Sequence, residues 1–466
     1  MKNYAFLLFP VVAFLVVFIG FGFNGMYGQD AYEYANLARR IQNFLAHDSQ
    51  LGHFGWPPGY PICGALLGFI TENIFLAMQL VSTISLVTTA WFVNRTIRIL
   101  NREQQFAGIY TLLFISACPF LMKAGVLVMS DMGCAACIAG LLFHAIKFRK
   151  LEKDSSLVWF FLFAAAACMF RYAAILLTFI PMLWLIPRIY RERKYLQLLT
   201  GIIIALVIVF PFLVLQINNP LGFLSRGLIA DWSFLNYFRA TFDSIDGHVE
   251  YKVPNIVYAF AIPFHPGFFI EGLLFLTVLF TSRRVYSTEK MMFGVFVLYA
   301  LFIAGMPVQS QRFFVPALIF LLIPGYRGFD KIARLLTGSF RAIIFSVLFI
   351  FHIAYFSWNL KPYIERSRLE QDILTWISAN TNQPDIYTVD MDISLAGNGL
   401  ERNYHNLWRT QYDSFEKGSL VLVNPKVIAA QWNGRNPMKN WRKLNREYQL
   451  ALLKSFDKGW ELYEIR

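Results

Sequence analysis

The chain has 466 residues, of which 57% are hydrophobic, 17% aromatic and only 15% charged. This composition excludes an ordinary soluble domain and is typical of a protein that crosses a membrane several times. The formal net charge is +13 at pH 7, but the basic residues are dispersed over many short loops and form no single stripe. We therefore expect membrane lipids, and no nucleic acid, around this chain.

Eleven apolar segments approach the length of about 20 residues that a helix needs to cross a bilayer. They are 4–23, 74–98, 106–122, 128–147, 157–170, 172–187, 197–217, 256–281, 291–306, 312–326 and 340–358. The first segment has no small-x-small cleavage site before polar sequence, so we expect a retained anchor and no cleaved signal peptide. The pattern predicts an α-helical polytopic membrane protein with about eleven transmembrane helices.

Lysine and arginine are distributed unequally between the two sides of the predicted membrane domain. With the N-terminus in the cytoplasm, the inner loops hold 19 of these residues and the outer loops hold 8. Positive charge accumulates on the cytoplasmic side of membrane proteins. This orientation places a long first loop, 24–73, and the C-terminal tail, 359–466, outside the cytoplasm.

The tail is more polar than the rest of the chain and has mixed periodicity. The stretches SRLEQDILTWISANT (367–381) and MKNWRKLNREYQLALLKSF (438–456) have helical spacing, whereas DIYTVD (385–390), GSLVLVN (418–424) and KGWELYEIR (458–466) resemble strands. We therefore predict a transmembrane domain, 1–358, followed by a small extracytoplasmic α/β domain, 359–466.

The five cysteines all lie in or beside apolar segments, which indicates no disulfide framework. Cys134 and Cys137 have the spacing of a redox or zinc motif, but no matching Cys or His pair follows them. The alternative, which we favour, is that this run of small residues lets helices approach each other closely. We expect no cofactor, and a divalent metal is left as an open alternative.

The first outer loop begins with GQDAYEYANLARR (28–40), a charged stretch beside a membrane span. Its apolar spacing predicts a helix lying along the membrane surface, and Asp30 and Glu33 would share one face of that helix. Asp30 either caps the helix or acts as a well-placed base, and the two roles are compatible. Glu33 fits a capping arrangement or a pocket.

An elbow rich in proline and aromatic residues follows in GHFGWPPGYPICGALLG (52–68). Its two adjacent prolines interrupt any continuous helix, so the chain must turn and re-enter as a short apolar segment before Glu72. The elbow serves as a membrane anchor or as the wall of a pocket.

Further charged residues lie near the outer ends of predicted spans, where ionisable groups are costly and usually functional. Asp131 begins a span in VLVMSDMG, Arg171 lies between two short spans in FRYAAIL, and Arg312 precedes a span in QSQRFFVPALIFL. Lys123 and the polar residues Gln309 and Gln311 lie on the same side.

These motifs together resemble the GT-C superfamily of membrane glycosyltransferases, in particular the branch of protein mannosyltransferases and aminoarabinose transferases that uses polyprenyl-phosphate sugars. The likeness rests on the acidic start of the first outer loop, the Pro-Pro-x-Tyr segment after it, and the positions of Asp131, Arg171, Arg312 and Pro316. It covers residues 1 to about 330.

The resemblance implies an inverting transfer of a sugar from a polyprenyl-phosphate donor to the hydroxyl of a lipid, glycan or protein acceptor at the outer face of a bacterial inner membrane. Asp30 and Asp131 would be the catalytic residues, and Arg312, Arg171 and Lys123 would bind the donor phosphate. The expected pocket residues are Glu33, Tyr34, His53, Trp56, Pro58, Tyr60, Gln309 and Gln311. The related lipid-monophosphate enzymes generally work without a metal.

Two other classes stay open at this point. One is a transporter or flippase for a lipid-linked or small solute, although such proteins usually show two corresponding halves and charges at the membrane midplane. The other is a glycan polymerase or ligase of a different membrane family.

Overall fold

The computed structural model describes residues 4–47, 51, 55–101, 104–215, 227–244, 247–268, 272–274, 278 and 286–466. These residues form two compact units. The first unit comprises Met1–Gly25, Leu37–Arg239 and Val253–Leu360, and the second comprises Met26–Asn36, Ala240–Lys252 and Lys361–Arg466. The limits 1–358 and 359–466 for functional domains stay a prediction.

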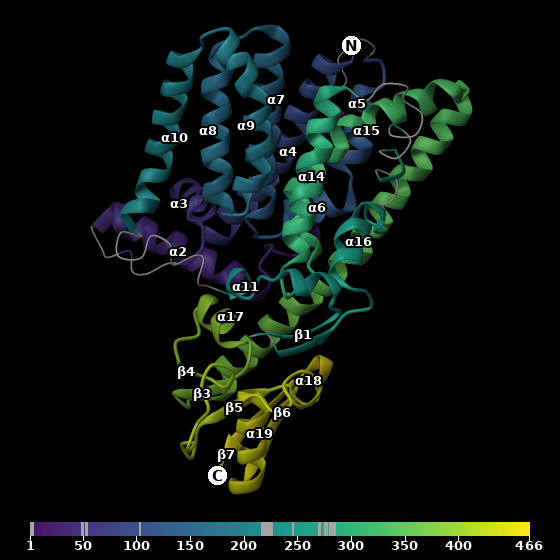
Figure 1. The fold of residues 1–466 in the computed structure, drawn as a ribbon. Helices are drawn as coiled ribbons and strands as arrows, with labels where there is room; N and C mark the ends of the chain where they lie inside the picture. Colours follow the sequence, from purple (N-terminus) through teal and green to yellow (C-terminus); the bar gives the residue numbers. More distant parts are fainter. Residues whose placement is uncertain are drawn as a thin grey trace. The chain divides into compact units, whose positions relative to one another are not determined.

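The first unit is helical (Figure 1). Its elements are α1 (Ala5–Leu15), η1 (Val16–Gly20), α3 (Gly59–Thr71), α4 (Ile74–Leu100), α5 (Ala107–Thr111), η2 (Leu112–Ser116), α6 (Pro119–Val126), α7 (Asp131–Leu151), α8 (Ser155–Phe170), α9 (Ala174–Arg191), α10 (Tyr195–Leu215), α11 (Gly227–Ala230), η3 (Phe234–Phe238), α12 (Asn255–Ala261), η4 (Ile262–Phe264), α14 (Ser287–Ala304), η5 (Gln311–Phe314) and α15 (Val315–Leu335). Two further helices, α2 (Gly28–His47) and α16 (Gly338–Asn380), each contribute residues to both units.

Each of the eleven predicted spans contains an apolar helix among the described residues. Six helices are long and apolar enough to cross a membrane, and a seventh span results if Ala107–Ser116 and Pro119–Val126, which meet at 61°, are counted together. Four shorter apolar helices, Ala5–Gly20, Ser155–Phe170, Tyr195–Phe210 and Asn255–Phe264, lie in other predicted spans. The prediction of a polytopic helical membrane protein is confirmed.

Proline explains two interruptions between helices of the first unit. The bend before α6 occurs where Cys118 is extended and Pro119 starts a new helix, because the residue before proline avoids the helical region. As predicted, the chain also turns at Pro57 and Pro58 and re-enters as the short helix α3, which ends at Glu72 with a positive φ of 54°.

Small residues on α7 let α8 approach closely, as the sequence predicted. A Cβ atom on Gly133 would lie 2.3 Å from a ring carbon of Phe170, and one on Gly140 would lie 2.7 Å from a ring carbon of Phe163. Cys134 and Cys137 are buried in the same helix as free thiols. In Figure 1, α7, α8, α9 and α10 run side by side.

The second unit is built around a five-stranded sheet with strand order β4-β3-β5-β7-β6. Its elements are β3 (Asp385–Thr388), α17 (Asp392–Gly397), β4 (Asn403–Asn406), β5 (Leu420–Val423), α18 (Pro425–Gln431), α19 (Asn436–Glu447), β6 (Leu450–Ser455), η6 (Asp457–Gly459) and β7 (Glu461–Ile465). β3 pairs in parallel with β4 and β5, whereas β7 pairs antiparallel with β5 and β6. A separate antiparallel hairpin, β1 (Thr241–Ser244) and β2 (Gly247–Glu250), belongs to the same unit.

Both faces of the five-stranded sheet are buried at its central strand β5, whose successive side chains point to opposite faces and are all buried. One face packs against α16 and α17, with a core of Leu369, Ile373, Ile377, Leu395, Leu420 and Leu422. The other packs against α18 and α19, with a core of Val421, Val423, Ile428, Met438 and Leu444. The predicted small α/β fold of the tail is therefore confirmed.

The tail differs from its predicted elements at two places. The last predicted span, 340–358, and the helical stretch predicted after it form part of one continuous helix, because α16 has 43 residues and runs through Pro362 to Asn380. The predicted helix 438–456 ends at Glu447, and Leu450–Ser455 is a strand instead. Pairing with β7 overrides the local helical spacing there.

Candidate functional site

Three charged residues predicted from separate motifs meet in the first unit. The Asp131 carboxylate forms an ion pair with the guanidinium of Arg171 through one oxygen, and its other oxygen lies 3.3 Å from Nε of Arg312. The Asp131 side chain is 2% exposed, whereas those of Arg171 and Arg312 are 15% and 33% exposed. Two cations and one anion leave this cluster with a net charge of about +1.

The loop before Asp131 is fixed by hydrogen bonds to main-chain oxygens. Val128 donates a hydrogen bond to the carbonyl oxygen of Gly25, and the buried Gln79 amide donates to the oxygens of Phe23 and Val126 at 3.2 and 2.9 Å. Gly25 has a φ of +77°, and a Cβ atom there would lie 2.6 Å from the Val126 oxygen. Only glycine fits this approach without strain.

Arg171 occupies the turn between α8 and α9, beside the proline elbow. The elbow packs so closely that a Cβ atom on Gly59 would lie 2.6 Å from the oxygen of Met169. Tyr60 is fully buried, and its hydroxyl lies 2.7 Å from Oγ of Ser82 on α4. The elbow therefore supports the end of α8. The Arg171 guanidinium, which follows α8, lies 5.1 Å from the centre of the Phe313 ring.

Arg312 belongs to η5, a single 3₁₀ turn held from two directions. Tyr299 donates a hydrogen bond of 2.9 Å to the carbonyl oxygen of Phe313, and Phe314 is fully buried. Pro316, which the resemblance singled out, is buried in the first turn of α15. The turn thus presents Arg312 from a rigid base.

A second polar group adjoins Arg312 along the chain. The side-chain amide of Gln311 lies 2.6 Å from Nε2 of His265, whose ring centre is 5.0 Å from that of Phe120. Nζ of Lys123 lies 5.9 Å from the centre of the same Phe120 ring. The sequence analysis selected Lys123 and Gln311 but missed His265, which lies between two prolines and looks structural from sequence.

Asp30, Glu33 and Tyr34 lie on the part of α2 that belongs to the second unit. The predicted helix is present as α2, but Asp30 is the third residue of the helix and does not occupy the capping position before it. That this helix lies along the membrane surface stays a prediction. Asp30 and Glu33 are half-buried, and Tyr34 is buried. A carboxylate in the first turn of a helix is stabilised by the helix dipole.

The other predicted pocket residues have different surroundings. Trp56 is 40% exposed, and Pro58 is a buried residue at the start of α3. The amide of Gln309 donates to Val253 and to Asn255 and so ties a loop to α12. His53 lies outside the described residues.

In the described part of the chain, no group of three or more His, Cys, Asp or Glu side chains is arranged to hold a metal ion. The cluster of Asp131, Arg171 and Arg312 offers electrostatic chemistry. An arginine carries five N–H donors in a planar fork that matches phosphate oxygens, and a buried carboxylate between two arginines fixes both forks. Such an arrangement can bind an anion.

Comparison with known proteins identifies the fold. Residues 56–215 match the family model described as dolichyl-phosphate-mannose-protein mannosyltransferase. The structure of ArnT from Cupriavidus metallidurans bound to undecaprenyl phosphate is similar with a TM-score of 0.63 and 13% identity, over 99% of this chain and 98% of that chain. Its apo structure gives a TM-score of 0.63 and 14% identity, over 98% and 97% of the two chains.

A third structure is the Archaeoglobus fulgidus oligosaccharyltransferase tethered with an acceptor peptide that contains the NVT sequon. It is similar with a TM-score of 0.57 and 13% identity, over 100% of this chain and 74% of that chain. No curated protein matches the chain by sequence. The chain therefore has the fold of the GT-C superfamily of membrane glycosyltransferases, and the resemblance predicted from its sequence is confirmed.

Proposed function

We propose that the chain is an inverting glycosyltransferase that moves a hexosyl or pentosyl group from a polyprenyl-phosphate donor to an acceptor hydroxyl. The observation that carries this proposal is the buried Asp131 with its two arginines. This cationic cluster occurs in a fold that binds undecaprenyl phosphate in ArnT. The reaction is assigned to the outer face of a bacterial inner membrane, where the donor tail stays in the bilayer.

The transfer is a single displacement at the anomeric carbon. The acceptor oxygen forms a bond to this carbon while the bond from the carbon to the phosphate oxygen breaks, and polyprenyl phosphate leaves with the electron pair. The acceptor proton passes to the Asp30 carboxylate, which acts as the general base. Arg171, Arg312 and Lys123 stabilise the negative charge that develops on the departing phosphate.

The ion pairs support a positioning role for Asp131. Arginines engage both of its carboxylate oxygens, and its side chain is 2% exposed. A carboxylate in this state orients its partners more readily than it accepts a proton from a substrate. We therefore assign the base to Asp30 alone and give Asp131 the task of holding the two guanidiniums in place.

The proposal is tested by transfer from radiolabelled polyprenyl-phosphate hexoses and pentoses in membranes that contain the native chain. The Asp30→Asn variant is compared with Asp154→Asn, the same chemical change at a carboxylate whose side chain is 39% exposed. We expect label to enter an acceptor with the native chain and with Asp154→Asn but not with Asp30→Asn. Lipid, glycan and protein fractions then identify the acceptor class.

Two outcomes would contradict the proposal. Movement of intact donor across the membrane without any covalent transfer would favour a flippase. Full transfer by a folded Asp30→Asn variant would remove Asp30 as the base while keeping the enzyme class.

A further inference from the structure

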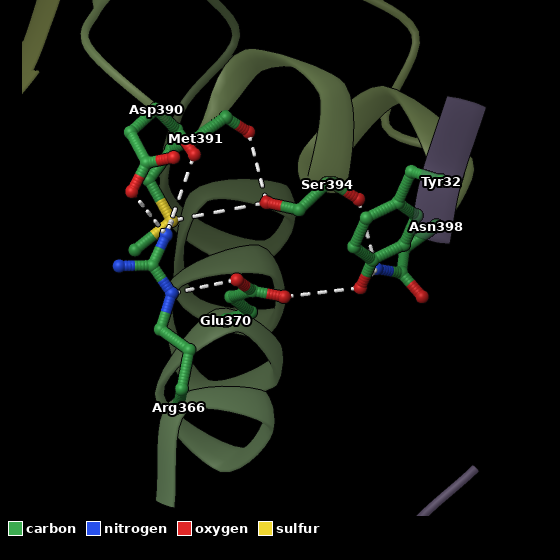
Figure 2. A network of polar contacts seen from close by, with 7 residues as sticks. All are labelled: Tyr32, Arg366, Glu370, Asp390, Met391, Ser394 and Asn398. Carbon is green, nitrogen blue, oxygen red and sulfur yellow. Dashed lines mark hydrogen bonds and ion pairs between the residues drawn. The ribbon is translucent and has the colours of Figure 1, made fainter. Parts of the chain in front are cut away.

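A buried tyrosine joins the first turns of α2 to the C-terminal domain. Tyr32 is 2% exposed, and its hydroxyl donates a hydrogen bond of 3.0 Å to Oε2 of Glu370 on α16. The same hydroxyl accepts a hydrogen bond of 3.0 Å from the Asn398 amide. Figure 2 shows Tyr32 entering this network from a separate helical segment.

The ring of Tyr32 is held as closely as its hydroxyl. It lies against α17 at Gly397, where a Cβ atom would be only 2.5 Å from the ring carbon Cδ1 of Tyr32. The residue just before α2 makes a second contact with α16, because the ring centres of Tyr27 and Tyr363 lie 4.3 Å apart. Position 397 therefore accepts only glycine while Tyr32 keeps its place.

The acceptor of the Tyr32 hydrogen bond is itself fixed. Glu370 is 2% exposed, and its other oxygen lies 2.7 Å from Nε of Arg366. Arg366 in turn pairs with Asp390 at 3.1 Å. Burial and the Glu370 carboxylate raise the pKa of the Tyr32 hydroxyl, which keeps it protonated as a donor. Tyr32 and Glu370, the buried and hydrogen-bonded part of this network, are therefore held rigidly.

The position of Tyr32 on α2 connects this network to the candidate base. Residues of an α-helix follow one another at about 100°, so Tyr32 lies about 200° around the helix from Asp30. Glu33 and Tyr34 lie within about 60° of Asp30. Tyr32 therefore anchors the back of the turn whose opposite face carries Asp30.

We propose that the C-terminal domain is a positioning device for Asp30 and that Tyr32, clamped by Glu370, Asn398 and Gly397, is its point of attachment. This inference rests on the proposed function, in which Asp30 is the base. A misplacement of about 1 Å in a reacting group costs about 100-fold in rate. Tyr32 is thus a positioning residue and not a catalytic one.

The test measures kcat and donor KM for transfer by the full-length Tyr32→Phe variant in lipid vesicles. We expect kcat to fall about 10-fold to 100-fold while KM for the donor changes less than about twofold, since no donor contact is removed. Tyr404→Phe is the matched control, because it removes one hydroxyl hydrogen bond of 2.8 Å to Leu400 within the same domain. It should leave both constants unchanged.

Gly397→Ala is an independent test of the same inference by a substitution in the C-terminal domain. It displaces the Tyr32 ring without removing any hydrogen-bonding group. It should also lower kcat with an unchanged donor KM. The double variant Tyr32→Phe/Glu370→Gln should be no slower than the slower single variant, because both changes break one clamp. Thermal unfolding of each variant separates this effect from general loss of folded protein.

The outcomes separate the two proposals. If the native chain transfers sugar and Asp30→Asn does not, but Tyr32→Phe and Gly397→Ala have the native kcat, the positioning role is overturned and the enzyme assignment stands. If Asp30→Asn is fully active, or if the native chain transfers nothing, the proposed base fails and the positioning role fails with it.

Discussion

Replacing Asp131 with asparagine removes the anion between two arginines while keeping the shape of the side chain. At an effective dielectric constant of about 20, a pair of unit charges 3.3 Å apart, the distance from Asp131 to Arg312, interacts by about 5 kcal/mol. Desolvation of the charges offsets part of this value. Breaking a buried pair by removing one partner usually costs about 3–5 kcal/mol, and the partial exposure of Arg312 places our expectation near the lower end.

The Asp131→Asn variant also separates two electrostatic roles. The net charge of the cluster rises from about +1 to about +2, so a purely electrostatic effect would strengthen binding of an anion. We expect weaker binding of polyprenyl phosphate instead, because the guanidiniums lose the carboxylate that fixes their orientation. The free energy of unfolding is measured in mixed micelles, and lipid-phosphate affinity is measured on the same preparations.

Asp154→Asn is the control for this experiment. Asp154 also lies at the start of a helix and pairs with Lys194 at 2.5 Å, but the two side chains are 39% and 25% exposed. Surface pairs contribute about 0–1 kcal/mol. The reasoning is refuted if Asp131→Asn loses no more stability than Asp154→Asn, or if it binds polyprenyl phosphate more tightly than the native chain.

Three further predictions concern the same unit. Gly25→Ala should lower the free energy of unfolding by about 2–4 kcal/mol, because a positive φ costs about 1–2 kcal/mol and the added methyl group meets a carbonyl oxygen. The control Gly22→Ala has a φ of +62° and no atom within 4 Å, so it should lose only the part due to the backbone conformation. Equal losses of stability in thermal unfolding of the two variants would contradict this prediction. Gln79→Ala should lower the free energy of unfolding by about 3 kcal/mol, because two buried carbonyl oxygens lose their hydrogen-bond donor. A chemical unfolding curve like that of the native chain would disprove this prediction. Arg171→Lys should lower kcat/KM for the donor about 10-fold, because lysine lacks the planar fork, and an unchanged ratio would argue against a phosphate contact.

The membrane part of the fold was predictable because a bilayer imposes long apolar helices. Every predicted span contains an apolar helix among the described residues, although four of these helices are shorter, and the Pro-Pro elbow indicated the start of α3 within a residue or two. The continuous helix α16 was not predictable, since a change from apolar to polar composition near residue 360 suggests a boundary. The polar half of α16 is stabilised by the sheet that it covers, which is a tertiary effect.

The candidate site was predictable in its residue types but not in its pairing. Unpaired charges are costly at membrane depth, and this rule selected Asp131, Arg171 and Arg312 from three distant motifs. His265 was set aside because it lies between two prolines and therefore looked structural. The Gln311 contact that marks His265 depends on tertiary structure alone.

Tyr32 shows a different limit of the sequence analysis. Its neighbours Asp30, Glu33 and Tyr34 were selected because their chemistry or motif position is suggestive, whereas Tyr32 belongs to no pattern that the sequence analysis used. Its partners Glu370 and Asn398 follow more than 300 residues later, at sequence separations of 338 and 366. Only the folded chain reveals that a tyrosine beside the candidate base is bound to the tail.

The division of labour between Asp30 and Tyr32 follows from what a base must do. A general base has to be fixed in position, yet it must also reach the proton that it accepts, so complete burial of the carboxylate would defeat its purpose. The helix meets both demands by burying a neighbour: Tyr32 is 2% exposed, whereas Asp30 is half-buried. If Asp30 is the base, loss of the Tyr32 clamp should therefore lower the rate of transfer without weakening the donor contacts.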